Sequence, residues 1–206
     1  MERYIIIILI GYLLGCLQWS YILGKTINKK DIRTLGAGNA GASNAVISFG
    51  WKMGVAVGLL DIIKAIISIL IIRYILKSSD TFDLYLNGTS VILGHNYPFY
   101  MGFKGGKGTA STVGMLFGID YRIGILGALV IAAVTIGSNY IALGTISLVI
   151  FFILATIYYN FGIGCILISI SIAALSIYNH IPNLRRIMAR NEDGLRDALK
   201  KKKKAE

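Results

Sequence analysis

The sequence predicts an all-α integral membrane protein, built as a bundle of seven transmembrane helices. Hydrophobic residues make up 55% of its 206 residues and the mean hydropathy is +0.68, above the roughly 45–50% apolar usage of soluble domains. Seven apolar runs follow one another along the chain. The glycine-rich basic segments between these runs all fall at one membrane face if every run crosses.

The apolar runs define the predicted spans. A transmembrane helix needs about 20 mostly apolar residues, and several runs approach this length. The first run is expected to remain as a span, because it is long for a secretory signal and no small-residue cleavage site follows it. The seven predicted spans are Tyr4–Gly24, Met53–Leu76, Leu84–Leu93, Thr109–Ile119, Ile123–Ser138, Ile141–Tyr159 and Phe161–Tyr178.

The third and fourth predicted spans are short, and hydropathy alone favours five spans. Basic residues between the first two runs favour a cytoplasmic loop there, which places the N-terminus outside. If the third and fourth runs both cross, the basic stretch 103–108 and the lysines at 200–204 are cytoplasmic as well. Short spans need their polar backbone buried in protein or in a wet cavity, so we expect cytoplasmic glycine-rich loops around a cleft.

Charge and cysteine usage exclude several other classes. The net charge of +11 owes much to the C-terminal end, so we expect one membrane-embedded domain over residues 1–190 and a basic, disordered cytoplasmic tail over 191–206 that contacts anionic lipid headgroups. No soluble module offers a basic face for nucleic acid. Cys16 and Cys165 lie inside apolar runs, so neither a disulfide nor a metal site is expected.

The first glycine-rich segment spans residues 36–44. It formally matches the G-x-G-x-x-G dinucleotide fingerprint, but that motif needs a strand before it and a helix after it in a soluble unit. Exposed backbone N–H groups beside amide and hydroxyl side chains instead suit an anionic headgroup. The alternative is a tight turn between spans. The candidate binding residues are Gly36, Gly38, Asn39, Ser43 and Asn44.

The second segment, residues 103–108, has the parts of a phosphate cradle. It is not a Walker A loop, because no glycine stands five residues before Gly106 and no Ser or Thr follows the second lysine directly. Glycines admit close backbone approach, two lysines supply charge, and a span begins directly afterwards. The alternative is a pair of lysines that reach lipid phosphates. The candidate residues are Lys104, Gly105, Gly106, Lys107 and Gly108.

A third segment follows the last predicted span. His180 and Asn183 are three residues apart and share a face if the helix continues, although Pro182 is a candidate helix end. Histidine is the side chain best suited to accept a proton near neutral pH, so His180 and Asn183 are the candidate catalytic residues. The alternative is an interfacial cap. His95, just before the second segment, is expected to be structural.

Asp61 and Lys64 lie on one face of the second predicted span. Ionisable groups at membrane depth need each other or a cavity. A buried structural pair is the preferred interpretation, and a catalytic or ion-relay role is the alternative.

Taken together, residues 36–44, 95–108 and 180–183 resemble the three signature segments of the membrane glycerol-3-phosphate acyltransferases that use acyl phosphate, the Y-type family. The resemblance covers nearly the whole chain and is most specific in the stretch 94–108. It implies a seven-helix enzyme of the bacterial cell membrane with a cytoplasmic active site. It further implies acyl transfer from acyl phosphate to the 1-hydroxyl of glycerol 3-phosphate, giving lysophosphatidic acid and phosphate, with no cofactor.

Three positions depart from the family pattern. Ala37 stands where the family usually has serine, Ile47 where it usually has arginine, and Asn191 where a glycine usually precedes the glutamate. Each lost donor or cation is expected to weaken substrate binding by about 1–3 kcal/mol. A degenerate paralogue that binds anionic lipid precursors or a partner without turnover is therefore one alternative. A small transporter that uses Asp61 and Lys64 as a relay is another.

The resemblance also implies roles in the reaction. Acyl phosphate is already activated, so the enzyme has to align two anionic substrates, and the proton of the attacking hydroxyl has to be removed. The glycine-rich segments are expected to bind phosphate, and His180 and Asn183 to orient glycerol 3-phosphate. The general base is either His180 or a substrate phosphate. Ser43 as an acyl-enzyme nucleophile lacks a base nearby in the sequence.

Overall fold

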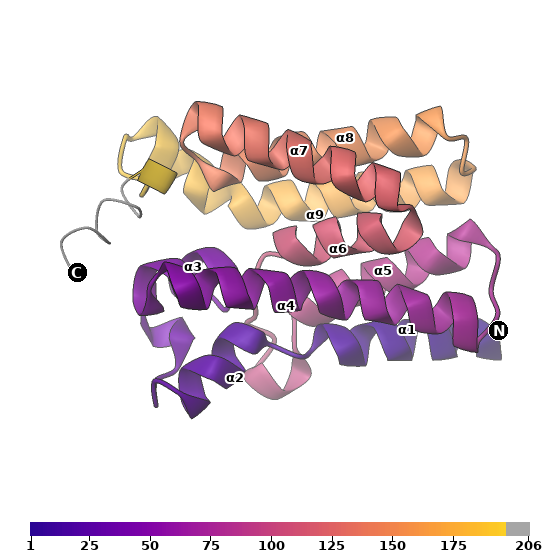
Figure 1. Cartoon of the computed structure of the whole chain (residues 1–206), viewed down its shortest axis with the longest axis horizontal. Helices are drawn as coiled ribbons and strands as arrows, with labels where there is room; N and C mark the ends of the chain where they lie inside the picture. The colour runs from indigo at the N-terminus through magenta and orange to yellow at the C-terminus, as the bar shows by residue number, and fades with distance from the viewer. Residues whose placement is uncertain (197–206) are drawn as a thin grey trace. The chain divides into compact units, whose positions relative to one another are not determined.

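A computed structural model describes residues 1–196, and every regular element in that range is helical (Figure 1). The chain forms two compact units, Met1–Gly124 and Ile125–Glu206, which are described separately. Most of the predicted basic tail, including the lysines at 200–204, lies outside the described residues.

The first unit holds the two glycine-rich segments. Two short 3-10 turns, η1 and η3, lie in its loops, and a π-helical turn, η2, extends α4. Its elements in order are α1 (Glu2–Gly15), α2 (Trp19–Thr26), η1 (Ile32–Thr34), α3 (Ala42–Phe49), α4 (Trp51–Leu70), η2 (Ile71–Ile75), α5 (Thr81–Asn96), η3 (Phe99–Met101) and α6 (Thr109–Ile119).

The first predicted span is broken rather than continuous. α1 ends at Gly15 and α2 begins at Trp19, so the carbonyls at the break lose their helical partners. Lys64 Nζ lies 3.0 Å from the Gly15 carbonyl oxygen and 2.7 Å from that of Leu17. The Tyr100 hydroxyl donates to the Cys16 carbonyl at 2.8 Å. The break is tolerated because these side chains replace the missing backbone partners.

Close helix contacts hold the first unit together, and α1 lies along α5 while α4 lies along α6 (Figure 1). A Cβ on Gly94 of α5 would lie 2.2 Å from the Tyr12 carbonyl oxygen of α1. A Cβ on Gly114 of α6 would lie 2.3 Å from the Ile62 carbonyl oxygen of α4. Glycine at these contacts lets the helix backbones approach as closely as membrane helices often do.

Within residues 1–196, five segments are long and apolar enough to cross a membrane, and α6 is a shorter apolar helix. Large apolar side chains such as Leu13, Leu59 and Leu129 are more than half exposed, whereas Asp61 and Lys64 are buried. This inversion is typical of a multi-pass membrane protein. The five segments are Glu2–Thr26, Trp51–Ile75, Tyr121–Ser138, Ile141–Tyr158 and Ile163–Met188.

Three long helices follow, α7 (Tyr121–Ser138), α8 (Ile141–Tyr158) and α9 (Ile163–Met188), and most of α7 belongs to the second unit. Pro182, the candidate helix end, does not end the helix, because α9 continues through it to Met188. Proline removes one helical hydrogen bond, but the turns beyond it are held by bonds from Asn183 and Arg186 to Glu192.

Candidate active site

The first loop, residues 36–44, is shaped by one buried side chain. Asn44, at the start of α3, is fully buried, and its Oδ1 accepts a hydrogen bond from the Ala37 N–H at 2.7 Å. Its Nδ2 lies 3.0 Å from the Leu35 carbonyl oxygen and 2.8 Å from that of Asn39. A Cβ on Gly36, where φ is +51°, would lie 2.3 Å from Asn44 Oδ1. The Asn44 amide is therefore engaged by the loop itself, and its contact with a ligand stays a prediction.

Two predicted ligand-binding side chains of the first loop lie nearer its surface. Ser43, in the first turn of α3, is exposed, and Asn39 is partly exposed. Asn39 Oδ1 accepts from the Gly41 N–H at 3.1 Å, which leaves the amide nitrogen with only a 3.4 Å contact to the Ala37 carbonyl. Gly38 has φ of +71°, so the backbone turns here in a conformation that favours glycine. The outward donors of the first loop are thus Ser43 and the Asn39 amide.

The glycine loop, residues 103–108, is anchored to the end of α5. The Gly105 N–H donates to the Asn96 carbonyl and the Gly106 N–H to the His95 carbonyl, both at 3.0 Å. These two N–H groups were predicted to face phosphate, but they are engaged with the protein backbone. Lys104 is exposed and Lys107 is partly exposed. The cations and the positive end of α6 are therefore the groups that this loop offers to an anion.

The two loops are bonded to each other, as their predicted convergence requires. The Ala40 N–H donates to the Gly105 carbonyl at 3.0 Å, and Arg33 Nη1 donates to the Met101 carbonyl at 2.7 Å. Arg33 also pairs with Asp31, whose carboxylate lies 2.8 Å from Nη2. The hydrogen bond from Arg33 holds the pKa of Asp31 below its ordinary value. Two of the three predicted segments thus form one polar surface, although they are far apart in the chain.

The third segment lies on α9, in the second unit. His180 is buried, and its Nδ1 lies 2.8 Å from the Ser176 carbonyl oxygen. Because a carbonyl oxygen only accepts, this contact places a proton on Nδ1, and in the neutral ring Nε2 then carries the lone pair. Asn183 Nδ2 donates to Glu192. Contact of His180 and Asn183 with the two loops stays a prediction.

A buried ionic cluster, Asp61, Lys64 and His95, lies beneath the glycine loop. The predicted pair is confirmed, since Lys64 Nζ is 2.8 Å from Asp61 Oδ1 and both side chains are buried. Lys64 Nζ also lies 3.0 Å from His95 Nδ1. The His95 ring is buried and bonded within the protein, as expected for a structural histidine.

Some residues that organise this region escaped the sequence interpretation. Gln18, fully buried at the break in the first span, donates to the His95 carbonyl at 2.5 Å. Tyr100 binds the backbone at the same break. Glu192 orients Asn183. An uncharged polar residue inside an apolar run is the one signal that pointed to Gln18.

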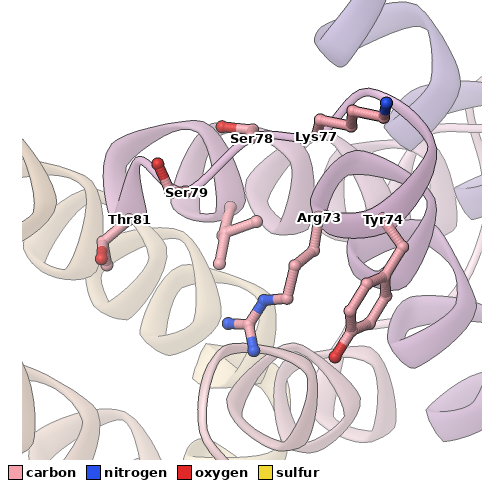
Figure 2. Close-up of a pocket in the computed structure, with 7 residues that line it drawn as sticks. Arg73, Tyr74, Lys77, Ser78, Ser79 and Thr81 are labelled. Carbon is pink, nitrogen blue, oxygen red and sulfur yellow. The ribbon is translucent and has the colours of Figure 1, made fainter.

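A separate hollow of about 510 Å³ lies at the far end of α4 from α3 and the first loop (Figure 2). None of the predicted site residues lines it. Arg73, on η2, donates to the Ile119 carbonyl at 2.7 Å, so part of its guanidinium supports the end of α6. Ser78 is bonded to Asp83 and Arg3. The lining residues are Arg73, Tyr74, Lys77, Ser78, Ser79, Thr81 and Leu84.

Comparison with known proteins identifies the family. The glycerol-3-phosphate acyltransferase family matches residues 5–190. Glycerol-3-phosphate acyltransferase 1 of Oceanobacillus iheyensis is 42% identical over 205 residues, covering 97% of this chain and 98% of the relative. The enzyme of that name from Thermoanaerobacter pseudethanolicus is 35% identical over 188 residues, covering 91% and 93%.

Solved structures agree with these relatives. The crystal structure of PlsY (YgiH), an integral membrane glycerol 3-phosphate acyltransferase in its glycerol 3-phosphate form, matches with a TM-score of 0.85 at 31% identity, covering 93% of this chain and 95% of that one. Its lysophosphatidic acid form matches with a TM-score of 0.82. Together with the bonded pair of loops, these matches show that the chain belongs to the glycerol-3-phosphate acyltransferase family, whose structures are integral to the membrane.

Proposed function

We propose that this protein transfers a fatty acyl group from acyl phosphate to the 1-hydroxyl of glycerol 3-phosphate. The products are lysophosphatidic acid and inorganic phosphate, as in phospholipid synthesis. The observation that carries the proposal is the bond between the Ala40 N–H and the Gly105 carbonyl, which joins the first loop to the glycine loop. Solved relatives named for their glycerol 3-phosphate and lysophosphatidic acid forms support the same acceptor substrate and the same product.

In the proposed reaction the 1-hydroxyl oxygen attacks the acyl carbonyl carbon. The bond from that carbon to the phosphate oxygen breaks, and phosphate leaves with the electron pair. The hydroxyl proton passes to Nε2 of His180 or to a phosphate oxygen of a substrate. Acyl phosphate is activated before it binds, so the step needs alignment and charge screening rather than a covalent acyl-enzyme.

The binding roles follow the exposed polar groups. Lys104 and Lys107 hold the phosphate of the acyl donor, supported by the positive end of α6, while Gly105, Gly106 and Gly108 shape the loop that carries both lysines. Ser43 and Asn39 lie on the first loop, where Gly36, Gly38 and Asn44 set the backbone. Asn183, aligned by Glu192, orients glycerol 3-phosphate together with His180. The departures at Ala37 and Ile47 weaken this site without removing its main cations.

The protein is a multi-pass protein of the bacterial membrane, and we place both loops at its cytoplasmic face. Seven spans, with α5 and α6 as the short third and fourth, put the N-terminus outside and the C-terminus in the cytoplasm. A single cysteine placed at Lys104 tests this topology in whole cells. Labelling of that cysteine by a membrane-impermeant reagent added outside the cell would overturn the arrangement, because the glycine loop would then face away from the cytoplasm, where we expect both substrates.

Turnover of purified protein tests the proposed activity. With palmitoyl phosphate and glycerol 3-phosphate, we expect phosphate and lysophosphatidic acid to form in equal amounts. Lys107→Ala is expected to raise the KM for palmitoyl phosphate by about tenfold or more, since a charge-assisted phosphate contact is lost. Lys52→Ala removes one exposed cation outside the loops and serves as the matched control. No phosphate release above blank would favour the alternative suggested by Ala37 and Ile47, a paralogue that binds without turnover.

A further inference from the structure

Lys64 contacts more groups than an ion pair requires. Its ammonium lies 2.8 Å from Asp61 Oδ1, 3.0 Å from the Gly15 carbonyl oxygen and 2.7 Å from the Leu17 carbonyl oxygen. It also lies 3.0 Å from His95 Nδ1. The same His95 Nδ1 lies 3.5 Å from Asp61 Oδ1, so this ring nitrogen faces both members of the ion pair. One side chain of α4 therefore contacts the break in the first span and the last turn of α5 together.

His95 in turn supports the glycine loop from below. Its carbonyl accepts from the Gly106 N–H at 3.0 Å and from Gln18 Nε2 at 2.5 Å. Its ring lies against the same residue, because a Cβ on Gly106 would lie 2.1 Å from His95 Nε2. The position of the His95 ring thus decides where Gly106 lies, and Gly106 stands between Lys104 and Lys107.

A second polar link joins the same three helices without charge. One turn along α4, the Ser68 hydroxyl donates to Asn87 Oδ1 of α5 at 2.7 Å. Asn87 Nδ2 donates to the Ile7 carbonyl of α1 at 3.0 Å. Neither side chain contacts the first loop or the glycine loop in the described part of the chain. Neutral side chains are therefore sufficient to brace α1, α4 and α5, and bracing alone does not explain the charged cluster.

We propose that Lys64 is a positioning residue for acyl transfer. Held by Asp61, it sets the His95 ring, and through His95 it sets the Gly106 backbone between the two phosphate-binding lysines. This inference rests on the proposed function, in which the glycine loop binds the phosphate of the acyl donor. It assigns the buried cluster to substrate alignment rather than to ion transport or proton transfer.

The test removes both charges together. Lys64→Met alone leaves Asp61 buried and unpaired, whereas Asp61→Asn combined with Lys64→Met removes the cluster's charge without stranding an ion. Ser68→Ala is the matched control, because it removes a buried bond between the same helices. Hydrogen exchange at residues 103–108 is measured for each variant, together with kcat and the KM for palmitoyl phosphate.

We expect the double variant to exchange faster at residues 103–108 and its KM for palmitoyl phosphate to rise by about tenfold or more, as a misplaced binding loop would cause. Ser68→Ala should leave both quantities at wild-type values. If the double variant does not accumulate, His95→Ala, which keeps the Asp61–Lys64 pair, carries the same expectation.

Unchanged exchange and unchanged KM in the variant that folds would overturn the positioning role and leave the cluster as a simple brace. The wild-type protein separates this outcome from failure of the proposed function. If wild type forms no lysophosphatidic acid, the acyltransferase assignment has failed. If wild type turns over normally and the double variant matches it, only the positioning role has failed.

Discussion

The two units of the protein use their buried polar side chains differently. In the first unit several of these side chains connect separate elements, as Lys64 connects α4 to the break after α1, and Asn44 connects α3 to the preceding loop. In the second unit, the buried Thr156 and Ser169 donate to carbonyls four and three residues earlier in the same helix.

This difference follows from the backbone that each unit contains. α7, α8 and α9 are regular over most of their length and satisfy their own carbonyls, so their hydroxyl side chains add little to the contacts between elements. The first unit contains a broken span and two loops with positive φ angles, and irregular backbone in a membrane protein needs partners from elsewhere in the fold. Polar side chains that cross between elements therefore mark where the fold departs from regular helices to build a site.

The C-terminal end of α9 carries the candidate catalytic residue of the second unit, and a substitution of His180 tests its proposed role. We expect His180→Ala to lower kcat by about a hundredfold or more if Nε2 accepts the hydroxyl proton. Ser169→Ala, about three turns earlier on the same helix, should keep wild-type kcat. A change confined to the KM for glycerol 3-phosphate would instead assign His180 to binding.

A substitution of Asn44 tests, through the stability of the protein, whether buried side chains that connect elements contribute more than those that bond within one helix. Asn44→Ala removes the acceptor for the Ala37 N–H and a donor for the Leu35 and Asn39 carbonyls, so we expect a loss of about 1–3 kcal/mol in the free energy of unfolding. Ser169→Ala is buried to a similar degree but bonds only locally, and its effect should stay within about 0.5 kcal/mol. Thermal melts in detergent compare them. Equal melting temperatures for the two variants would contradict the distinction between the units.

Ala37 lies in the first loop, and Ile47 lies on α3 close to Gly36 of that loop. Ile47 is 43% exposed and its Cγ2 would be 3.2 Å from a Cβ on Gly36, so a cation at this position reaches the loop. We expect Ala37→Ser with Ile47→Arg to raise kcat/KM several-fold, because each change adds a donor near the phosphate. Ile47→Lys without the hydroxyl separates the charge from the hydrogen bond. A fall in activity would show that the apolar residues suit this loop.

The Asp31–Arg33 pair gives the smallest expected effect, a dependence on pH. The pKa of Asp31 is lowered in the fold, so its contribution to stability is present above its ordinary value and is lost as the pH falls through the folded value. Melting temperatures of wild type and Asp31→Asn should therefore differ at neutral pH and converge below about pH 4. A gap that persists in acid would mean that the pair does not stabilise the loop.

The sequence predicted elements whose signals are local. The predicted fourth span has the same bounds as α6, Thr109–Ile119, because a glycine precedes it and an aspartate follows it. The Asp61–Lys64 pair followed from its three-residue spacing on a buried helix. In both cases neighbouring residues contain the whole signal.

The features that the sequence did not predict depend on distant partners. The break at Cys16–Gln18 contains no proline, and its carbonyls find Lys64 and Tyr100 far along the chain. α3 begins inside a segment that composition marks as a loop, and Asn44 was expected to contact ligand rather than backbone. Hydropathy and spacing describe what each residue prefers, whereas these contacts depend on which residues the fold brings together.

The break in the first span has a consequence for how the protein enters the bilayer. The ribosome delivers α1 and α2 before α4, so the Gly15 and Leu17 carbonyls reach the membrane before the ammonium group that will bind them. Until then lipid offers those carbonyls no donor. We therefore expect the first span to insert stably only after the second span has entered the membrane. The earliest stable intermediate in biogenesis then contains both spans.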